Sequence, residues 1–269
     1  MADPFDTGPL PAIAAEDEAF VAVYKPPRMH SAPGKGGGDL CAWVFERYPE
    51  TAGAARGSGR AAGEGGLLHR LDYETSGLVL FARSPAAFEF LLREQAEGRF
   101  VKEYLAAVAP SPAPGLAGSR PLRSAPLGMD AAAWEAALGR SEAGGLAALI
   151  GASPGLRIES RFKPFGPGAA RVACLDPAEP VAARERAAPR TYATAILEAA
   201  AAEGGLLILA SLALGFRHQI RAQLAWVGLP IRGDAAYGGA TAPRLCLHAC
   251  RLRFRHPLTG LEALVESAR

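Results

Sequence analysis

The stretch LLHRLDYETSGLVLFA, residues 67–82, is the most informative part of the chain. Its last five residues, Leu78–Ala82, form a compact apolar run that predicts a buried strand. Polar residues lead into that run, and among them is the carboxylate of Asp72. A carboxylate on a polar loop before a core strand is held rigidly and stays reachable, which suits a catalytic acid, base or nucleophile. A loop Asp also commonly forms a turn or a cap, so this position alone leaves both roles open.

Ten residues of this stretch, HRLDYETSGL at 69–78, resemble the signature of the RluA-type RNA pseudouridine synthases, in which the D of HRLD is the nucleophile. The resemblance implies that Asp72 acts as nucleophile or base on a flipped-out uridine. It also implies that His69 and Arg70 contact the phosphate or fill the space left by the extruded base. A purely structural ion pair is the alternative for Arg70.

Two further segments resemble this family in the expected order along the chain. Lys25-Pro26-Pro27 follows two short strands that we expect within residues 12–24, and Arg28 stands where the family usually has Gly. Residues 102–106, Lys-Glu-Tyr-Leu-Ala, resemble the second motif of the family. This implies that Tyr104 stacks on the flipped uracil and relays a proton from C5.

The segment GFRHQIRAQL at 215–224 resembles the family motif G-R-T-H-Q-I-R-V-H-L, whose second Arg pairs with the nucleophilic Asp. Arg221 occupies that position, and the segment departs from the motif at Phe216, Arg217 and Gln223. Residues 230–238 and 245–249 match the following segments of the family. The resemblance therefore implies three catalytic residues: Asp72, Tyr104 and Arg221. It implies RNA contacts from polar residues in and beside the motifs: His69, Arg70, Lys102, Arg217, His218, Gln219 and Arg232.

Composition is consistent with a globular protein that binds RNA. The chain has 269 residues and 49% hydrophobic content, enough for a sizeable core. The net charge is only +2, but residues 217–255 carry seven Arg and one acid, and clustered Arg side chains fit contact with RNA. No apolar run approaches the roughly 20 residues that span a bilayer. Four scattered cysteines and an acidic N-terminus without a basic segment predict a reduced, cytoplasmic protein.

No metal or cofactor is expected. Residues 34–38, Gly-Lys-Gly-Gly-Gly, lack the spacing of a phosphate-binding loop. Cys246, His248 and Cys250 would share one face of a strand, but no fourth ligand is evident. Pseudouridine formation itself needs no energy source or redox group.

Local patterns predict several elements. We expect helices at 40–48 and from Ser84-Pro85 to Gly98 and a strand at 101–109. We also expect a hairpin of strands 191–197 and 206–212 with a turn at Glu203-Gly204-Gly205. We expect a helix that begins within residues 215–224 and ends at Gly228 and Pro230, with its buried face formed by Ile220, Leu224 and Val227. Residues 110–190 predict only one helix, at 131–138. Within them, 161–166 (RFKPFG) is either a basic-aromatic RNA-binding patch or a surface turn that covers the core.

The resemblance implies an α+β fold: a large, bent, mostly antiparallel sheet with helices outside and a central RNA cleft. We expect one catalytic domain over residues 1–269 with two sub-lobes, a variable insertion at 110–190, and no N-terminal S4 domain. The expected function is isomerisation of uridines in structured RNA by a monomer, with ribosomal RNA favoured over tRNA. A catalytically silent RNA-binding or RNA-folding protein is the alternative. An aspartyl phosphotransferase is a second one, since Asp72-x-Glu74-x-Ser76 faintly resembles D-x-D-x-T.

Overall fold

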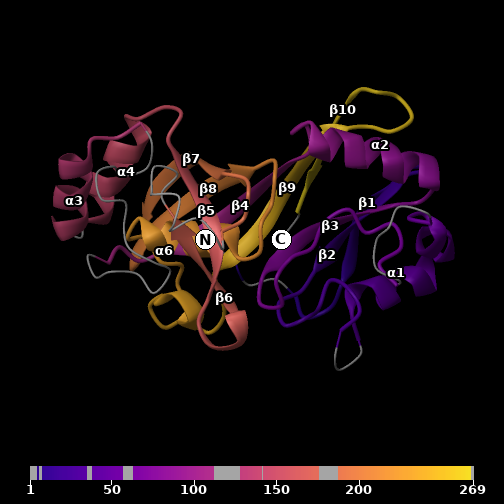
Figure 1. Ribbon diagram of the computed structural model, residues 1–269, viewed down its shortest axis with the longest axis horizontal. Coiled ribbons are helices and arrows are strands. Elements are labelled where there is room, and N and C mark those ends of the chain that lie inside the picture. Colours follow the sequence, from indigo (N-terminus) through magenta and orange to yellow (C-terminus); the bar gives the residue numbers. More distant parts are fainter. Residues whose placement is uncertain are drawn as a thin grey trace. The chain divides into compact units, whose positions relative to one another are not determined.

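The computed structural model describes residue 5 and residues 8–34, 38–56, 63–111, 128–140, 142–175 and 187–267 (Figure 1). The chain divides into two compact units. Unit 1 comprises Met1–Glu103 and His248–Arg269, and unit 2 comprises Tyr104–Leu247.

Unit 1 combines a sheet with two helices. Its elements are β1 (Ala12–Glu16), β2 (Phe20–Lys25), α1 (Leu40–Arg47), the 3-10 helix η1 (Pro49–Gly53), β3 (Ser76–Ala82), α2 (Pro85–Ala96), the start of β4 (Val101–Val108), β9 (Leu247–Arg255) and β10 (Glu262–Glu266). The strand order is β1-β2-β3-β9, and β10 pairs with β9. The β1–β2, β2–β3 and β9–β10 pairs are antiparallel.

Strand β3 is the centre of unit 1, and all seven of its residues are buried. It begins two residues earlier than the apolar run predicted, because Ser76 and Gly77 pair in parallel with His248 and Ala249 of β9. Gly77 has a φ of 121°, and a Cβ placed there would lie 2.3 Å from the carbonyl oxygen of Ala249. Only glycine permits this close approach of two backbones. The Ser76 hydroxyl and His248 Nδ1, 2.9 Å apart, add a buried hydrogen bond between the two strands.

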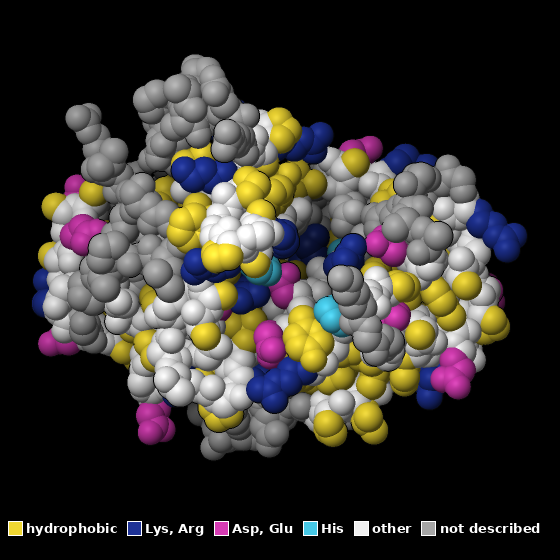
Figure 2. Space-filling model, turned by 60° about the horizontal axis from the view of Figure 1, so that its bottom comes forward, with side chains coloured by type: hydrophobic (Ala, Val, Ile, Leu, Met, Phe, Trp, Pro, Cys, Tyr) yellow, Lys and Arg dark blue, Asp and Glu magenta, His cyan; other side chains and the backbone are white. Residues whose placement is uncertain are grey.

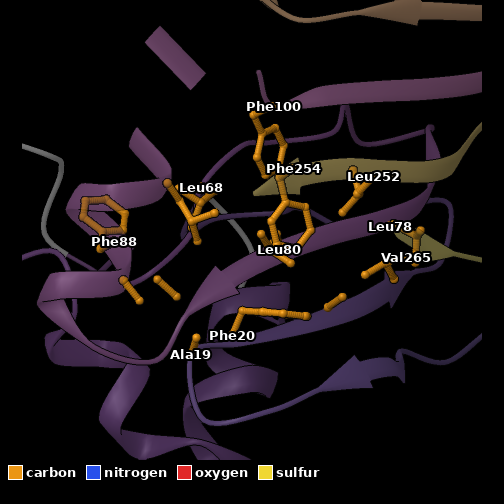
Figure 3. Packing of buried hydrophobic residues seen from close by; sticks show 14 of the residues in the cluster. Ala19, Phe20, Leu68, Leu78, Leu80, Phe88, Phe100, Leu252, Phe254 and Val265 are labelled. Atoms are coloured by element: carbon orange, nitrogen blue, oxygen red, sulfur yellow. The ribbon is translucent and has the colours of Figure 1, made fainter. Parts of the chain in front are cut away.

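The apolar core of unit 1 lies between its sheet and helix α2. Phe20 meets Phe254 edge to face at 5.2 Å between ring centroids, and Phe100 stacks on Phe254 at 5.6 Å (Figure 3). Phe88 and Leu91 of α2 belong to the same cluster. Helix α2 begins as predicted, because the Ser84 side chain accepts a hydrogen bond from the backbone N–H of Ala87.

Unit 2 is also built from a sheet and helices. Its elements are the remainder of β4, α3 (Ala131–Arg140), α4 (Ala143–Gly151), β5 (Arg157–Phe165), the 3-10 helix η2 (Pro167–Ala169), β6 (Arg171–Leu175), β7 (Tyr192–Ala202), β8 (Gly205–Leu212), α6 (Gln219–Trp226) and the 3-10 helix η3 (Ala235–Tyr237). The strand order is β4-β8-β7-β5-β6. The β5–β6, β5–β7 and β7–β8 pairs are antiparallel. The α+β class predicted from the sequence is confirmed.

The described parts of residues 110–190 contribute to the core of unit 2. Trp134 of α3 is buried, and its indole N–H donates to the Val227 carbonyl, 2.9 Å away, just after α6. Helix α4 packs against β7. The helix predicted at 131–138 is confirmed as α3, whereas α4, β5 and β6 were missed.

The structure of residues 161–165 contradicts one of the two interpretations of this segment. The surface-turn interpretation of 161–166 is wrong, because this segment continues β5 as far as Phe165. Pro164 suggested a turn, yet it lies opposite Val172 of β6, whose N–H donates to the Tyr237 hydroxyl and not to β5. This position of the strand pair exchanges no backbone hydrogen bond, so a proline is tolerated.

Helix α6 is more deeply placed than its apolar spacing predicted. All eight of its residues are buried, including Arg221 and Gln223, so it has no solvent-facing side. It ends before Gly228, whose φ of 87° terminates the helix as predicted.

Candidate active site

Asp72 lies at the first position of a turn that leads directly into β3. The N–H of Thr75 donates to the Asp72 carbonyl over 3.1 Å and closes the turn. The Asp72 residue is partly exposed and Tyr73 is exposed. The predicted combination of a reachable carboxylate and a rigid strand is therefore present.

The segment 25–31 fixes the backbone on both sides of Asp72. The fully buried ammonium group of Lys25 donates to the carbonyl oxygens of Pro26 and Met29, each at 2.9 Å, and to that of Tyr73 at 3.4 Å. The Ser31 hydroxyl donates to the Leu71 carbonyl and accepts from the Leu71 N–H, both at 2.9 Å. The sequence identified Lys25 only as the first residue of Lys-Pro-Pro after two predicted strands, and no local pattern indicated this role.

Arg28 takes over the backbone conformation of a glycine. Its φ is 60°, in the left-handed region that a residue with a Cβ rarely occupies. Its guanidinium lies 3.6 Å from the Glu74 carboxylate, and both side chains are exposed, so this ion pair contributes little stability. A glycine would adopt this conformation without strain, whereas Arg28 is strained there.

We expect Arg28→Gly to raise the free energy of unfolding by about 1 kcal/mol, because glycine adopts a positive φ without strain. Chemical denaturation monitored by circular dichroism measures this change. Arg28→Ala is the control, since it removes the side chain and retains a Cβ. Equal stability of the Gly and Ala variants would contradict the strain argument.

Three predicted RNA-binding residues of unit 1 are buried or have partners within that unit. His69 is buried and its Nε2 accepts from the Leu80 N–H at 3.4 Å. Arg70 forms an ion pair with Glu64 at 3.1 Å, so the structural alternative for Arg70 is present. Lys102 is buried, and burial lowers the pKa of its ammonium group to about 8. Their contacts with RNA stay predictions.

Arg221 forms a buried bidentate ion pair within unit 2. Its Nε and Nη2 lie 2.7 Å and 2.8 Å from the two carboxylate oxygens of Asp234. The guanidinium carbon also lies 5.3 Å from the centre of the Tyr237 ring. These two hydrogen bonds fix the orientation of the planar Arg221 guanidinium group. Its pairing with Asp72, in unit 1, stays a prediction, as does the stacking role of Tyr104.

Tyr237 links this ion pair to two other elements. Its hydroxyl accepts from the Val172 N–H of β6 and lies 3.0 Å from His218 Nδ1. Burial raises the pKa of Tyr237 to about 12, so the phenol stays protonated at neutral pH. Asp234 and Tyr237 both belong to the segment PIRGDAAYG at 230–238, in which the sequence predicted a role for Arg232 alone.

The three departures from the family motif in 215–224 have partners within unit 2. Phe216 stacks on Phe162 of β5, with ring centroids 4.8 Å apart and planes 4° apart. Arg217 Nη2 donates to the carbonyls of Ala169 and Arg171, at 2.6 Å and 3.1 Å. Gln223 Nε2 donates to Ser160 Oγ and to the Tyr192 carbonyl, at 3.0 Å and 2.9 Å. Each substituted side chain thus attaches the 215–224 segment to a neighbouring strand or turn.

Two other predicted RNA-binding residues also have internal contacts. The buried Gln219 side chain accepts from the Phe216 N–H and donates to the Ala193 carbonyl and to Thr194 Oγ1. Arg232 donates to the Glu203 carbonyl at 3.0 Å, at the turn between β7 and β8. Whether these residues and His218 also contact RNA stays a prediction.

The described part of the chain contains no group of three or more His, Cys, Asp and Glu side chains placed to hold a metal ion. No helix among the described residues is long and apolar enough to cross a bilayer.

Comparison with known proteins identifies the family. Residues 19–226 match the family described as RNA pseudouridylate synthase. The "Ribosomal large subunit pseudouridine synthase D" of Nitrosomonas europaea is 26% identical over 95% of this chain and 61% of its own length. An "Uncharacterized RNA pseudouridine synthase" of Chloroflexus aurantiacus is 29% identical over 86% of this chain and 57% of its own length.

The solved structure of human RNA Pseudouridylate Synthase Domain Containing 1 resembles the fold with a TM-score of 0.57. It is 19% identical, and the match covers 97% of this chain and 84% of that one. The chain spans about three fifths of the length of the first curated relatives that it matches. The family match covers well over half of the chain and includes the Asp72 turn, β3 and helix α6. The chain therefore belongs to the RNA pseudouridylate synthase family.

Proposed function

We propose that this protein isomerises specific uridines to pseudouridine in structured RNA, with Asp72 as the nucleophile or base. The observation that carries the proposal is the Asp72 turn, clamped at Leu71 by Ser31 and at Tyr73 by Lys25. A turn whose only role was to connect two elements would not need a buried lysine and a buried serine on either side of its carboxylate. Their placement favours a group that must be aimed.

The reaction breaks the bond between uridine N1 and C1′, turns the uracil, and forms a bond between C5 and C1′. The proton on C5 is lost and N1 gains one, so the atoms balance without a cofactor. Asp72 would act by attacking C1′ or C6, or by removing the C2′ proton. Because the uridine must leave its stack, at a cost of a few kcal/mol, loops and bulges are the favoured targets.

The other predicted catalytic residues complete this proposal. Arg221 would pair with Asp72 and keep it ionised through a charge-assisted hydrogen bond. Tyr104, which is 7% exposed, would stack on the flipped uracil and relay the C5 proton. Residues 1–269 would act as one catalytic domain with two sub-lobes and an insertion at 110–190, as a monomer in the cytoplasm.

Ribosomal RNA is the proposed substrate, ahead of tRNA. Three of the first four curated relatives carry the name ribosomal large subunit pseudouridine synthase D. These names support ribosomal RNA as the substrate class.

Transcriptome-wide pseudouridine mapping in cells that lack this protein tests the proposal. We expect one or a few sites in large-subunit ribosomal RNA to disappear, and to return when the wild-type gene is restored. Loss of sites in tRNA alone would correct the substrate. Unchanged sites in every RNA would contradict the enzyme assignment and favour the catalytically silent RNA-binding protein.

A further inference from the structure

Strands β5 and β6 form a ribbon that leaves the sheet of unit 2. Residues 157–160 of β5 pair with β7, from Arg157 opposite Ala195 to Ser160 opposite Tyr192. From Arg161 onward the strand that pairs with β5 among the described residues is β6, ending with Phe165 opposite Arg171, and the Phe162 carbonyl accepts from the Ala188 N–H at 2.7 Å. We call residues 161–175 the β5–β6 ribbon; Figure 1 shows its two strands running together to a turn.

The two faces of the β5–β6 ribbon differ in chemistry. Phe162, Val172 and Cys174 are buried in unit 2. On the opposite face Arg161, Lys163, Phe165 and Arg171 are partly exposed, and the apolar Ala173 and Leu175 beside them are buried. The ribbon sequence contains no Asp or Glu. Figure 2 shows that Lys and Arg side chains lie beside hydrophobic ones on the face that it presents.

The ribbon is fixed to the segment that carries Arg221. Arg217, just before α6, donates to two carbonyls at the ribbon turn. Arg171 donates in the opposite direction, to the Ala236 carbonyl of η3 at 3.1 Å. The Phe162–Phe216 stack adds an apolar contact. Since a lone two-stranded ribbon is marginally stable in water, these contacts keep its cations in fixed positions.

The cations at the base of the ribbon differ from Arg157 in their partners within the described part of the chain. Among the residues that the structure describes, no Asp or Glu pairs with Arg161 or Lys163, whereas Arg157 on the same strand pairs with Glu159 at 2.7 Å. The Arg161 Nε is buried and has no hydrogen-bond partner there. A buried donor without an acceptor is costly.

Next to these cations, Arg171 stacks on Phe165, with its guanidinium carbon 4.9 Å from the ring centre. Planar guanidinium and aromatic groups are the surfaces on which unpaired bases stack. The ribbon therefore offers phosphate binding and base stacking side by side.

We infer that the exposed face of the β5–β6 ribbon docks a single-stranded segment of the substrate RNA. Arg161 and Lys163 bind its phosphates, and the Phe165–Arg171 stack receives a base. The inference rests on the proposed function for the identity of the ligand. It also gives Arg217, a departure from the family motif, the role of holding the docking surface in place.

Fluorescence anisotropy with a labelled single-stranded RNA of mixed sequence tests this inference, using the full chain. We expect Arg161→Gln with Lys163→Gln to weaken binding about tenfold at about 0.1 M salt. The slope of log K against log salt should fall by about 1.4, since each phosphate contact on a single strand accounts for about 0.7. Phe165→Leu should weaken binding about tenfold with an unchanged slope, because stacking releases no counterions.

Arg157→Gln is the matched control, since it removes a cation from the same strand that is already paired with Glu159. It should leave affinity and slope unchanged. An unchanged slope in the double variant would overturn the inference. Equal competition by polyglutamate and by RNA of the same charge would also overturn it, because the surface would then be a general polyanion site.

Measuring pseudouridine formation beside RNA binding separates this inference from the proposed function. If the wild-type protein makes no pseudouridine in any RNA, but RNA binding by the ribbon variants still depends less on salt, RNA docking stands and the enzyme assignment fails. If the ribbon variants bind RNA and form pseudouridine as the wild type does, the docking surface is refuted and the enzyme assignment stands.

Discussion

Replacing Asp72 with asparagine is expected to reduce the rate of pseudouridine formation by about 10³-fold or more, the scale on which enzymes lose activity when a nucleophile or general base is removed. The amide has nearly the shape of the carboxylate but neither attacks C1′ nor accepts a proton. The turn should persist, because the hydrogen bond that closes it uses the backbone carbonyl of residue 72. Single-turnover release of tritium from C5-labelled uridine in a substrate RNA measures this rate.

Glu74→Gln is the matched control for Asp72→Asn. Glu74 lies in the same turn, and its carboxylate pairs with Arg28 over 3.6 Å at the surface. Loss of so exposed an ion pair should change stability and rate little. RNA affinity should be unchanged in both variants. If Asp72→Asn kept more than about a tenth of the activity, Asp72 would not be the nucleophile or base.

Replacing Asp234 with alanine is expected to lower the free energy of unfolding by about 3–5 kcal/mol, because Arg221 would remain buried without its counter-charge. The side chains of Arg221 and Asp234 are only 9% and 1% exposed, so water cannot take over the lost contacts. Replacing both at once, with Arg221→Met and Asp234→Leu, should recover most of the stability. Urea denaturation of the single and double variants completes this cycle.

Asp234 should also act as a positioning residue for Arg221 in the proposed reaction. The milder Asp234→Asn variant keeps one carbonyl acceptor but loses the bidentate charged pair. We expect kcat to fall about 10-fold to 100-fold with KM nearly unchanged, since Arg221 would lose its fixed orientation while the proposed RNA-binding residues stay in place.

Glu94→Gln is the control for this effect on kcat. Glu94 is a buried carboxylate with bidentate contacts to Arg99, and that guanidinium holds the Glu94 pKa below its usual value. Its loss should reduce stability without changing kcat. If kcat fell equally in both variants, the effect of Asp234 would be one of stability alone.

Secondary structure that depends on neighbouring residues was predicted well. The Ser84 cap of α2, the β7–β8 hairpin with its Glu203-Gly204-Gly205 turn and the end of α6 at Gly228 all follow from residues within a few positions of each other. The residue pattern of 69–78 identified the family and placed Asp72 before a buried strand. These features are local, so the sequence displays them directly.

Strands β5 and β6 and helix α4 were missed because tertiary packing overrides their local signals. Helix α4 contains Gly144 and Gly145, which disfavour a helix, and packs against β7. Pro164 is unusual within a strand, but it is tolerated in β5 because the N–H of Val172, which lies opposite, donates to the Tyr237 hydroxyl.

The sequence by itself determined the α+β class, the family and the position of the candidate nucleophile, because these depend on short patterns of apolar, polar and turn-forming residues. Only the tertiary structure decided how the site is held. Lys25 reaches Tyr73 across 48 positions, Asp234 meets Arg221 across 13, and Arg217 reaches Ala169 across 48. Such contacts form between groups that the folded backbone brings within 3.5 Å, and no local spacing rule specifies which distant groups will meet.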